Sequence, residues 1–353
     1  MQRLLQGRNP FILGGILVAI ILSVLFVKPA MPTIQLPAEK IPGLSIFGFP
    51  VTNTLLATLL ADVTLVVLGL LAVRKMRDVP EGLQNLFEWV WEAFDGMITD
   101  IAGKDNGRKW MPMFMTVLLF LLIANWWELV PGFDSVGIIE PLEVTYVESG
   151  GTVTSGAAKG TFLGLPSIVR PKGAISISLT DEQKQRALEE AEEAEAHGEA
   201  YHGPHDPEHA SGGYTLLPFF RAAATDLNLP IALALISVGI SQVIGIRRLR
   251  GKYARRFVAP VYTNNKFIDS LIGVLEFISE LAKIVSLSFR LFGNIFAGQV
   301  LLFVMAFLLA LLLPLPFFGL ELFVGFMQAF VFAILTVIYF EQSIHSHAGD
   351  EHH

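Results

Sequence analysis

The chain alternates long apolar runs with short polar connections. The apolar runs cover residues 11–27, 51–73, 111–130, 229–246, 265–312 and 317–340. Roughly 20 consecutive apolar residues cross the hydrocarbon core of a bilayer, and only helices do so without leaving backbone groups unpaired. The pattern therefore predicts an all-α integral membrane protein with five to six membrane helices.

The first run, residues 11–27, has two interpretations. It follows Arg3 and Arg8, as the apolar part of a secretory signal peptide does, yet it also fits a retained first helix. The segment Lys28-Pro29-Ala30-Met31 after it is a poor small-residue cleavage site, which favours the retained helix.

Residues 81–101 carry apolar side chains at steps of three and four, including Leu83, Phe87, Val90 and Phe94. This period predicts an amphipathic helix, over about residues 80–102, that lies along the membrane surface. A docking surface for a soluble partner is the competing interpretation.

The run at residues 265–312 is too long for an upright membrane helix. It contains no proline, and as one helix it would measure roughly 70 Å, against a hydrocarbon core of roughly 30 Å. Pro314 and Pro316 follow, and then the last run. We therefore expect a long, strongly tilted antiparallel hairpin.

Segment 133–214 differs from the rest because it is polar and acidic. We expect a helix at residues 178–200, where Ser178, Thr180 and Asp181 offer N-caps. The histidines of this segment share no helical spacing, so a solvated loop is favoured over a metal site: His197, His202, His205 and His209.

These features predict five regions. They are an N-terminal membrane helix with its outer loop at 1–44, two membrane helices with the amphipathic helix at 45–132, the acidic insertion at 133–214, a channel region with the tilted hairpin at 215–341, and a His-rich tail at 342–353.

Composition and charge agree with a membrane protein. Hydrophobic residues make up 53% of the chain and charged residues 16%, and the absence of cysteine excludes thiolate metal sites and Cys nucleophiles. Basic residues gather after two membrane runs, at 74–77 and 247–256. By the positive-inside rule both loops and the C-terminus are cytoplasmic, and the acidic insertion is outside. Nothing in this pattern indicates binding to nucleic acid.

Arg290 is the only charged residue in segment 284–313. A guanidinium stays protonated in lipid, and placing it near the bilayer centre costs roughly 2.5–3.5 kcal/mol on insertion scales. The side chain would either snorkel to the interface, pair with an acid on a neighbouring helix, or act as a fixed positive charge beside an ion path. Its position well inside the run favours the ion path.

Polar residues continue from Arg290 in both directions. One stripe recurs at steps of three and four: Glu276, Ser279, Lys283, Ser286, Arg290 and Asn294. Gln299 lies about half a turn away from Arg290, while Glu321 and Gln328 share one face of the last run. This layout predicts two offset half-paths separated by a fixed cation. Packing within the subunit, with satisfied hydrogen bonds, is the alternative.

Three motifs carry a resemblance to a known family. They are Ser286–Gly298 (SLSFRLFGNIFAG), Met327–Phe332 (MQAFVF) and Thr225–Asn228 (TDLN). Together they resemble subunit a of rotary F-type ATP synthases, over most of 47–130 and 223–341. The resemblance implies a non-catalytic stator subunit in the bacterial inner membrane, without a cofactor. Its implied partners are the c-ring, the peripheral-stalk b subunits and lipid.

The resemblance also implies a role for each matching residue. Arg290 would face the carboxylate of the rotating c-ring, supported by Asn294 and Gln328. Gln299, Glu321 and Asp226 would line the outer half-channel, and Glu276, Ser279 and Lys283 the cytoplasmic one. The chain departs from the family pattern at Gln299, where many members carry an acid or a histidine, and at Glu321, where others carry histidine.

Two other classes of protein fit less well. A self-sufficient secondary ion transporter or channel would usually show paired internal repeats, and none is evident. An intramembrane hydrolase would need a metal-spaced histidine cluster or a Ser/His pair inside the membrane runs, and the sequence has neither.

Overall fold

The structure is a computed structural model. It describes residues 38–344 apart from 47, 163, 172–173, 175, 207, 251–252, 254–256, 258–265 and 309–313, together with Gly15 and Val18. The predicted first membrane helix, at residues 11–27, and the histidines of the tail therefore lie outside the described residues.

Five of the described helices are long and apolar enough to cross a membrane. They are α2 (Asn53–Val73), α3 (Leu83–Trp127), α6 (Asn228–Leu249), α8 (Lys266–Leu308) and α9 (Pro314–Ile344). Each overlaps most of one predicted apolar run, so an all-α membrane architecture is confirmed. The chain is a multi-pass membrane protein.

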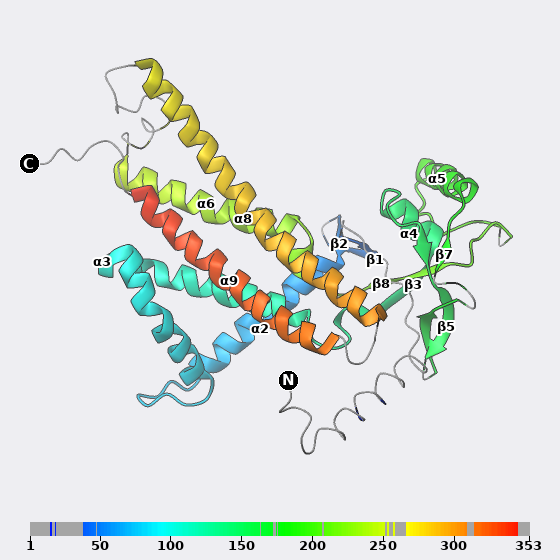
Figure 1. Ribbon diagram of the computed structural model, residues 1–353, viewed down its shortest axis with the longest axis horizontal. Coiled ribbons are helices and arrows are strands. Elements are labelled where there is room, and N and C mark those ends of the chain that lie inside the picture. Colours follow the sequence, from blue (N-terminus) through cyan, green and yellow to red (C-terminus); the bar gives the residue numbers. More distant parts are fainter. Residues whose placement is uncertain are drawn as a thin grey trace, which may run out of the picture. The chain divides into compact units, whose positions relative to one another are not determined.

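Helix α3 joins two predicted elements. The expected amphipathic helix and the third membrane run form one helix of 45 residues with a kink at Gly103, and the bend is visible in Figure 1. Gly103 has φ 71° and ψ 163°, a backbone conformation that residues with a Cβ atom rarely adopt. The helix ends at Trp127, three residues earlier than predicted.

Helices α8 and α9 form the predicted antiparallel hairpin. Lys283 on α8 lies over the ring of Tyr339 near the end of α9, whereas Gly298, later on α8, contacts Glu321 near the start of α9. Helix α9 begins at Pro314, three residues earlier than predicted. Proline suits the first turn of a helix because the backbone N–H it lacks would have no partner there.

Contacts divide the described chain into two compact units, which we treat separately. Unit 1 combines the N-terminal residues up to Leu56 with Glu128–Arg221 and Phe296–Leu322. Unit 2 combines Ala57–Trp127, Ala222–Ile295 and the residues from Phe323 onwards.

Unit 1 contains the acidic insertion and all the named strands. The strands pair in four antiparallel two-stranded sheets: β1 (Lys40–Ile46) with β2 (Phe49–Thr52), β3 (Gly137–Pro141) with β8 (Tyr214–Pro218), β4 (Ser155–Gly156) with β7 (Ile177–Ser178), and β5 (Ala158–Phe162) with β6 (Leu165–Val169). The sequence did not predict these strands, because each is short and carries no strong alternation.

The insertion also holds a small core and two helices, α4 (Leu142–Glu148) and α5 (Asp181–Ala196). Helix α5 confirms the predicted helix in a shorter form, and Thr180 with Gln183 makes a capping box at its start. The core of the insertion consists of Leu142, Tyr146, Val153 and Leu179.

In unit 2, polar bonds join the membrane helices. Asn125 on α3 donates to the backbone oxygen of Gly325 on α9 (3.0 Å), and Ser237 on α6 bonds Thr336 on α9 (2.8 Å). Trp127 donates its indole N–H to Thr64 on α2 (3.1 Å). Hydrogen bonds of this kind help membrane helices to associate, because the hydrophobic effect gives little driving force for helix association in lipid.

Candidate functional site

Arg290 lies on the exposed side of α8. Leu287, Leu291 and Ile295, on the opposite side of the helix, are each about 1% exposed and fix that side against the rest of unit 2. The guanidinium is exposed, and among the described residues it forms no ion pair with a carboxylate. The positive charge is therefore available to a partner outside this chain.

Small and polar side chains lie along the same side of α8 as Arg290, beside the exposed Val285 and Phe289. Ser286, Asn294 and Ala297 are exposed at steps of three and four along the same side of α8, and Gly293 lies beside them. Small side chains allow the backbone of another helix to approach closely in lipid. This side of α8 therefore suits contact with a neighbouring helix more than contact with lipid alone.

Unit 1 brings together four polar side chains that we call the acid group: Glu128, Asp134, Gln299 and Glu321. Gln299 donates its side-chain N–H to Asp134 (3.2 Å), and Glu321 lies against Gly298, the neighbour of Gln299. A Cβ at position 298 would overlap the carboxylate of Glu321, so glycine is required for this close approach.

Three members of the acid group are buried, and Asp134 is half-buried. Glu128, Gln299 and Glu321 are 7%, 5% and 5% exposed. Neither carboxyl oxygen of Glu128 has a hydrogen-bond partner among the described residues, and one oxygen of Asp134 and one of Glu321 also lack one. Unpaired buried carboxylates are costly, so this arrangement favours protonated acids.

Asp134 and Glu128, the two acids of the group that lie outside the membrane-spanning segments, both have raised pKa values. Burial raises the pKa of Asp134 to about 6, although the bond from Gln299 and the charge of Arg221 oppose the rise. Burial also raises the pKa of Glu128 well above its usual value, and the carboxylates of Asp134 and Glu321 add to the effect. Asp134 can therefore gain and lose a proton near neutral pH, and burial favours the protonated form of Glu128.

Unit 2 contains a second polar cluster, which we call the lysine group: Gln242, Tyr253, Glu280 and Lys283. Lys283 pairs with the buried Glu280 (2.8 Å), which also accepts a hydrogen bond from Gln242 (2.9 Å). Tyr253 donates to the side-chain oxygen of Gln242. Lys283 therefore packs within its own subunit, which was the alternative to a place in a half-path. Of the other stripe residues on the cytoplasmic side, Ser279 is exposed and Glu276 is half-buried.

The remaining predicted site residues lie in unit 2. Asn294 is exposed one turn after Arg290, and Gln328 is half-buried on α9. Asp226 accepts hydrogen bonds from the backbone and the side-chain N–H groups of Asn228 (3.1 and 3.0 Å), at the start of α6. These contacts give Asp226 a local capping role, and its place in an ion path stays a prediction.

Sequence reasoning missed three charged residues of these clusters: Glu128, Asp134 and Glu280. It also missed Arg221, whose charge opposes the rise in the pKa of Asp134. Glu128 lies near the end of the predicted membrane run at 111–130, and an acid in an apolar run was an available signal. Asp134 belongs to a segment interpreted as a separate insertion, and its bond to Gln299 joins residues 165 positions apart. No local pattern could have revealed that contact.

Comparison with known proteins adds independent information. The family model described as ATP synthase A chain matches residues 54–341. A protein of Syntrophobacter fumaroxidans named ATP synthase subunit a is 27% identical over 289 residues, which cover 81% of this chain and 82% of that protein. A protein of Moorella thermoacetica with the same name is 24% identical over 300 residues, covering 84% of this chain and 93% of that one.

The matched region contains the five membrane helices almost entirely, with the exposed Arg290, the acid group and the lysine group inside it. A match over most of the length, with the motifs in place, establishes the relationship, and the chain belongs to the ATP synthase A chain family.

Proposed function

We propose that this chain is the stator subunit of a rotary ATP synthase and couples ion flow to rotation of the c-ring through Arg290. The charge and exposure of Arg290 support this proposal most strongly. It is a permanent cation on an apolar helix, exposed from its own subunit and without a carboxylate ion pair among the described residues. Lipid alone would make that arrangement unfavourable.

A rotor carboxylic acid gives the cation a physical role. In lipid the acid stays neutral, because desolvation raises its pKa. Beside Arg290 the opposite charge favours the ionised form, so the acid releases its proton into the cytoplasmic half-channel during synthesis. The membrane potential contributes about 2.3 kcal/mol per charge per 100 mV to this cycle.

The acid group is the proposed outer half-channel. Glu321 and Gln299 belong to it as expected from the sequence, and Glu128 and Asp134 join them. Asp134, whose pKa is raised to about 6, can exchange a proton near neutral pH, which suits the delivery of protons to the rotor. We include Asp226 in the entrance of this path on the resemblance alone.

The exposed part of the polar stripe is the proposed cytoplasmic half-channel. Ser279 and Glu276 lead from Arg290 towards the basic loops, and Lys283 contributes through its pair with Glu280. Asn294 and Gln328 would support the arginine. Because Arg290 repels free protons, it would block a direct leak between the two paths.

The family assignment fixes the kind of activity. Members of this family are the non-catalytic subunit of the membrane sector, so Arg290 makes and breaks no covalent bonds. Our proposal adds the c-ring and the peripheral-stalk b subunits as partners. It also places the protein in the bacterial inner membrane with its C-terminus in the cytoplasm.

The proposal is tested by Arg290→Ala in the purified complex, reconstituted into liposomes with an imposed proton gradient. We expect loss of ATP synthesis with unchanged subunit content. Arg247→Ala, which removes an exposed arginine elsewhere in unit 2, serves as the matched control and should leave synthesis unchanged. Synthesis at the wild-type rate in a correctly assembled Arg290→Ala complex refutes the role.

The same preparation tests the alternative of a self-sufficient transporter. The isolated chain in liposomes should carry no proton flux, because each half-channel ends at a rotor acid that is then absent. Flux through the isolated chain at rates comparable to the complex would favour a transporter instead.

A further inference from the structure

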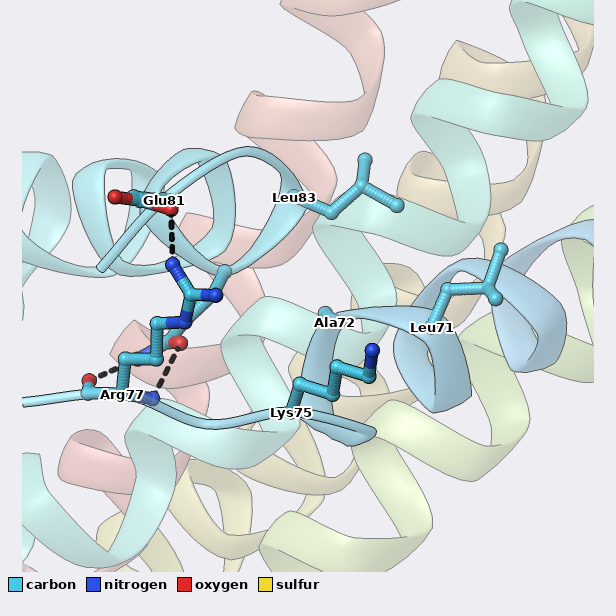
Figure 2. Close-up of a pocket in the computed structure, with 7 residues that line it drawn as sticks. Leu71, Ala72, Lys75, Arg77, Glu81 and Leu83 are labelled. Carbon is cyan, nitrogen blue, oxygen red and sulfur yellow. Dashed lines mark hydrogen bonds and ion pairs between the residues drawn. The ribbon is translucent and has the colours of Figure 1, made fainter.

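A cavity lies where the end of α2 meets the start of α3. Its volume is about 350 Å³, and it is lined by Leu71, Ala72, Lys75, Arg77 and Gln84, with Leu83 and Glu81 at the α3 side. Figure 2 shows Arg77 turned towards Glu81, while Lys75 extends away from that pair along α2. The cavity is separate from Arg290 and from both polar clusters.

The walls of the cavity are held in place by hydrogen bonds. The buried Gln84 accepts from the backbone N–H of Arg77 (3.0 Å) and donates to the backbone oxygen of the same residue (2.9 Å). It also donates to Glu88 one turn further along α3 (2.8 Å). These bonds fix the connection between the two helices, so the cavity is formed before any ligand binds.

The charge of the cavity favours an anion. Arg77 is already paired with Glu81, but Lys75 is exposed and forms no ion pair among the described residues. Arg74 precedes it in the sequence. A cavity with an available ammonium group, an extended backbone connection and few competing acids suits a phosphate group.

An apolar stripe leads directly to Lys75. Val63, Val67 and Leu71 lie at steps of four residues on α2, and all three are exposed. Because α2 is a membrane helix, this stripe faces lipid chains or another membrane protein. A ligand on this stripe would contact apolar side chains over two turns of α2 and the ammonium group of Lys75 at the end of the helix.

We propose that this cavity binds the headgroup phosphate of an anionic phospholipid, with an acyl chain along the stripe of Val63, Val67 and Leu71. Basic pockets beside membrane helices on the cytoplasmic side suit such headgroups. A free phosphate ion would use Lys75 but not the stripe. The inference depends on the membrane assignment of α2 and not on the role of Arg290.

The test uses the full-length protein, with the subunits that copurify, in phosphatidylcholine vesicles. A minor share of phosphatidylglycerol carries a photoreactive group in its acyl chain, and cross-linked peptides are located by mass spectrometry. We expect labelling within residues 63–84, and about fivefold less in Lys75→Gln, since one lysine near an anionic headgroup contributes that much. Lys104→Gln makes the same charge change on the exposed surface of α3 and should have no effect.

A second variant changes labelling in the opposite direction. Glu81→Gln removes the carboxylate that pairs with Arg77, so the guanidinium becomes available to the headgroup phosphate and labelling should increase. Misfolding cannot produce such an increase, and this variant decides the question if Lys75→Gln fails to accumulate.

Four results would overturn the proposal. They are equal labelling of wild type and Lys75→Gln, an equal loss in Lys104→Gln, equal labelling by a photoreactive phosphatidylcholine, and unchanged labelling in Glu81→Gln. Inorganic phosphate is added in a separate arm, against sodium chloride of equal ionic strength. Free phosphate lacks an acyl chain and should displace the lipid only weakly. Complete loss of labelling with phosphate alone would show that the stripe adds no affinity and would overturn the placement of the acyl chain.

Discussion

The acid group and the lysine group place buried carboxyl groups in opposite electrostatic situations. In the lysine group, Glu280 has a cation at 2.8 Å and an amide donor at 2.9 Å. In the acid group, Glu128 has no hydrogen-bond partner among the described residues, and Asp134 has one amide donor. A paired carboxylate stays ionised and holds structure together, whereas an unpaired buried acid readily takes up a proton.

This difference supports our proposal that the acid group, rather than the lysine group, carries protons. A proton carrier must change its charge during each cycle, and a firmly paired acid resists that change. We therefore expect the acid group to take part in proton transfer, and the Glu280–Lys283 pair to fix the fold near the cytoplasmic path.

The largest effect is expected from Lys283→Met. It leaves the buried Glu280 without its cation, and breaking a buried ion pair in this way costs about 3–5 kcal/mol. Thermal unfolding of the purified protein measures the loss. The double variant Lys283→Met/Glu280→Gln removes both charges and should recover most of the stability. Equal stability of the single variant and wild type would show that the pair is not structural.

Asp134→Asn, in contrast, should stabilise the folded protein. Because the pKa of Asp134 is raised from 3.8 to about 6, the folded protein loses stability as the pH rises through that interval. The variant should therefore be more stable than wild type by about 3 kcal/mol above pH 6, and equally stable below about pH 3. Asparagine can still accept the bond from Gln299. A gain that does not depend on pH would contradict this explanation.

Gly298→Ala tests how closely the two helices approach at the acid group. The added methyl group would overlap the carboxylate of Glu321 and force it away, at a cost of about 1–2 kcal/mol. Gly293→Ala is the matched control, because no atom lies within 4 Å of the corresponding Cβ position. Equal unfolding temperatures for the two variants would mean that Glu321 adapts without strain.

Glu321→Gln should slow proton-driven ATP synthesis by about tenfold. Removing a sole proton-transfer group usually costs 10²- to 10⁴-fold, and we expect less here because Glu128 and Asp134 remain. The rate is measured at several pH values, with Glu182→Gln on the exposed surface of α5 as the control. An unchanged rate across the pH range would remove Glu321 from the path.

The sequence predicted the membrane helices well, because hydrophobic length is a local property. The observed bounds of α2 and α6 lie within three residues of the predicted runs. The start of α9 was placed too late, since Pro314 was interpreted as a turn and in fact begins the helix. Helix α3 was predicted as two elements, and the kink at Gly103 separates them in the structure.

The sites were less predictable, because they depend on contacts between distant residues. Arg290 could be found from its isolation in an apolar run alone. The acid group could not, since the Asp134–Gln299 bond spans 165 positions and the first of these residues lies in a polar insertion. The Glu280–Lys283 pair spans only three positions, yet Lys283 was assigned to the cytoplasmic half-channel and its partner Glu280 was overlooked.

The central claim is that the exposed side of α8 around Arg290 faces the rotor, and disulfide cross-linking tests it most directly because the chain has no cysteine. Asn294→Cys, exposed one turn from Arg290, is combined with a cysteine one turn from the carboxylate of a c-ring subunit. The account predicts a rapid disulfide between the two subunits that stops ATP synthesis until it is reduced. Ile295→Cys, buried on the other side of α8, should not react. Absence of the Asn294→Cys cross-link in an assembled complex, or equal cross-linking from position 295, would contradict it.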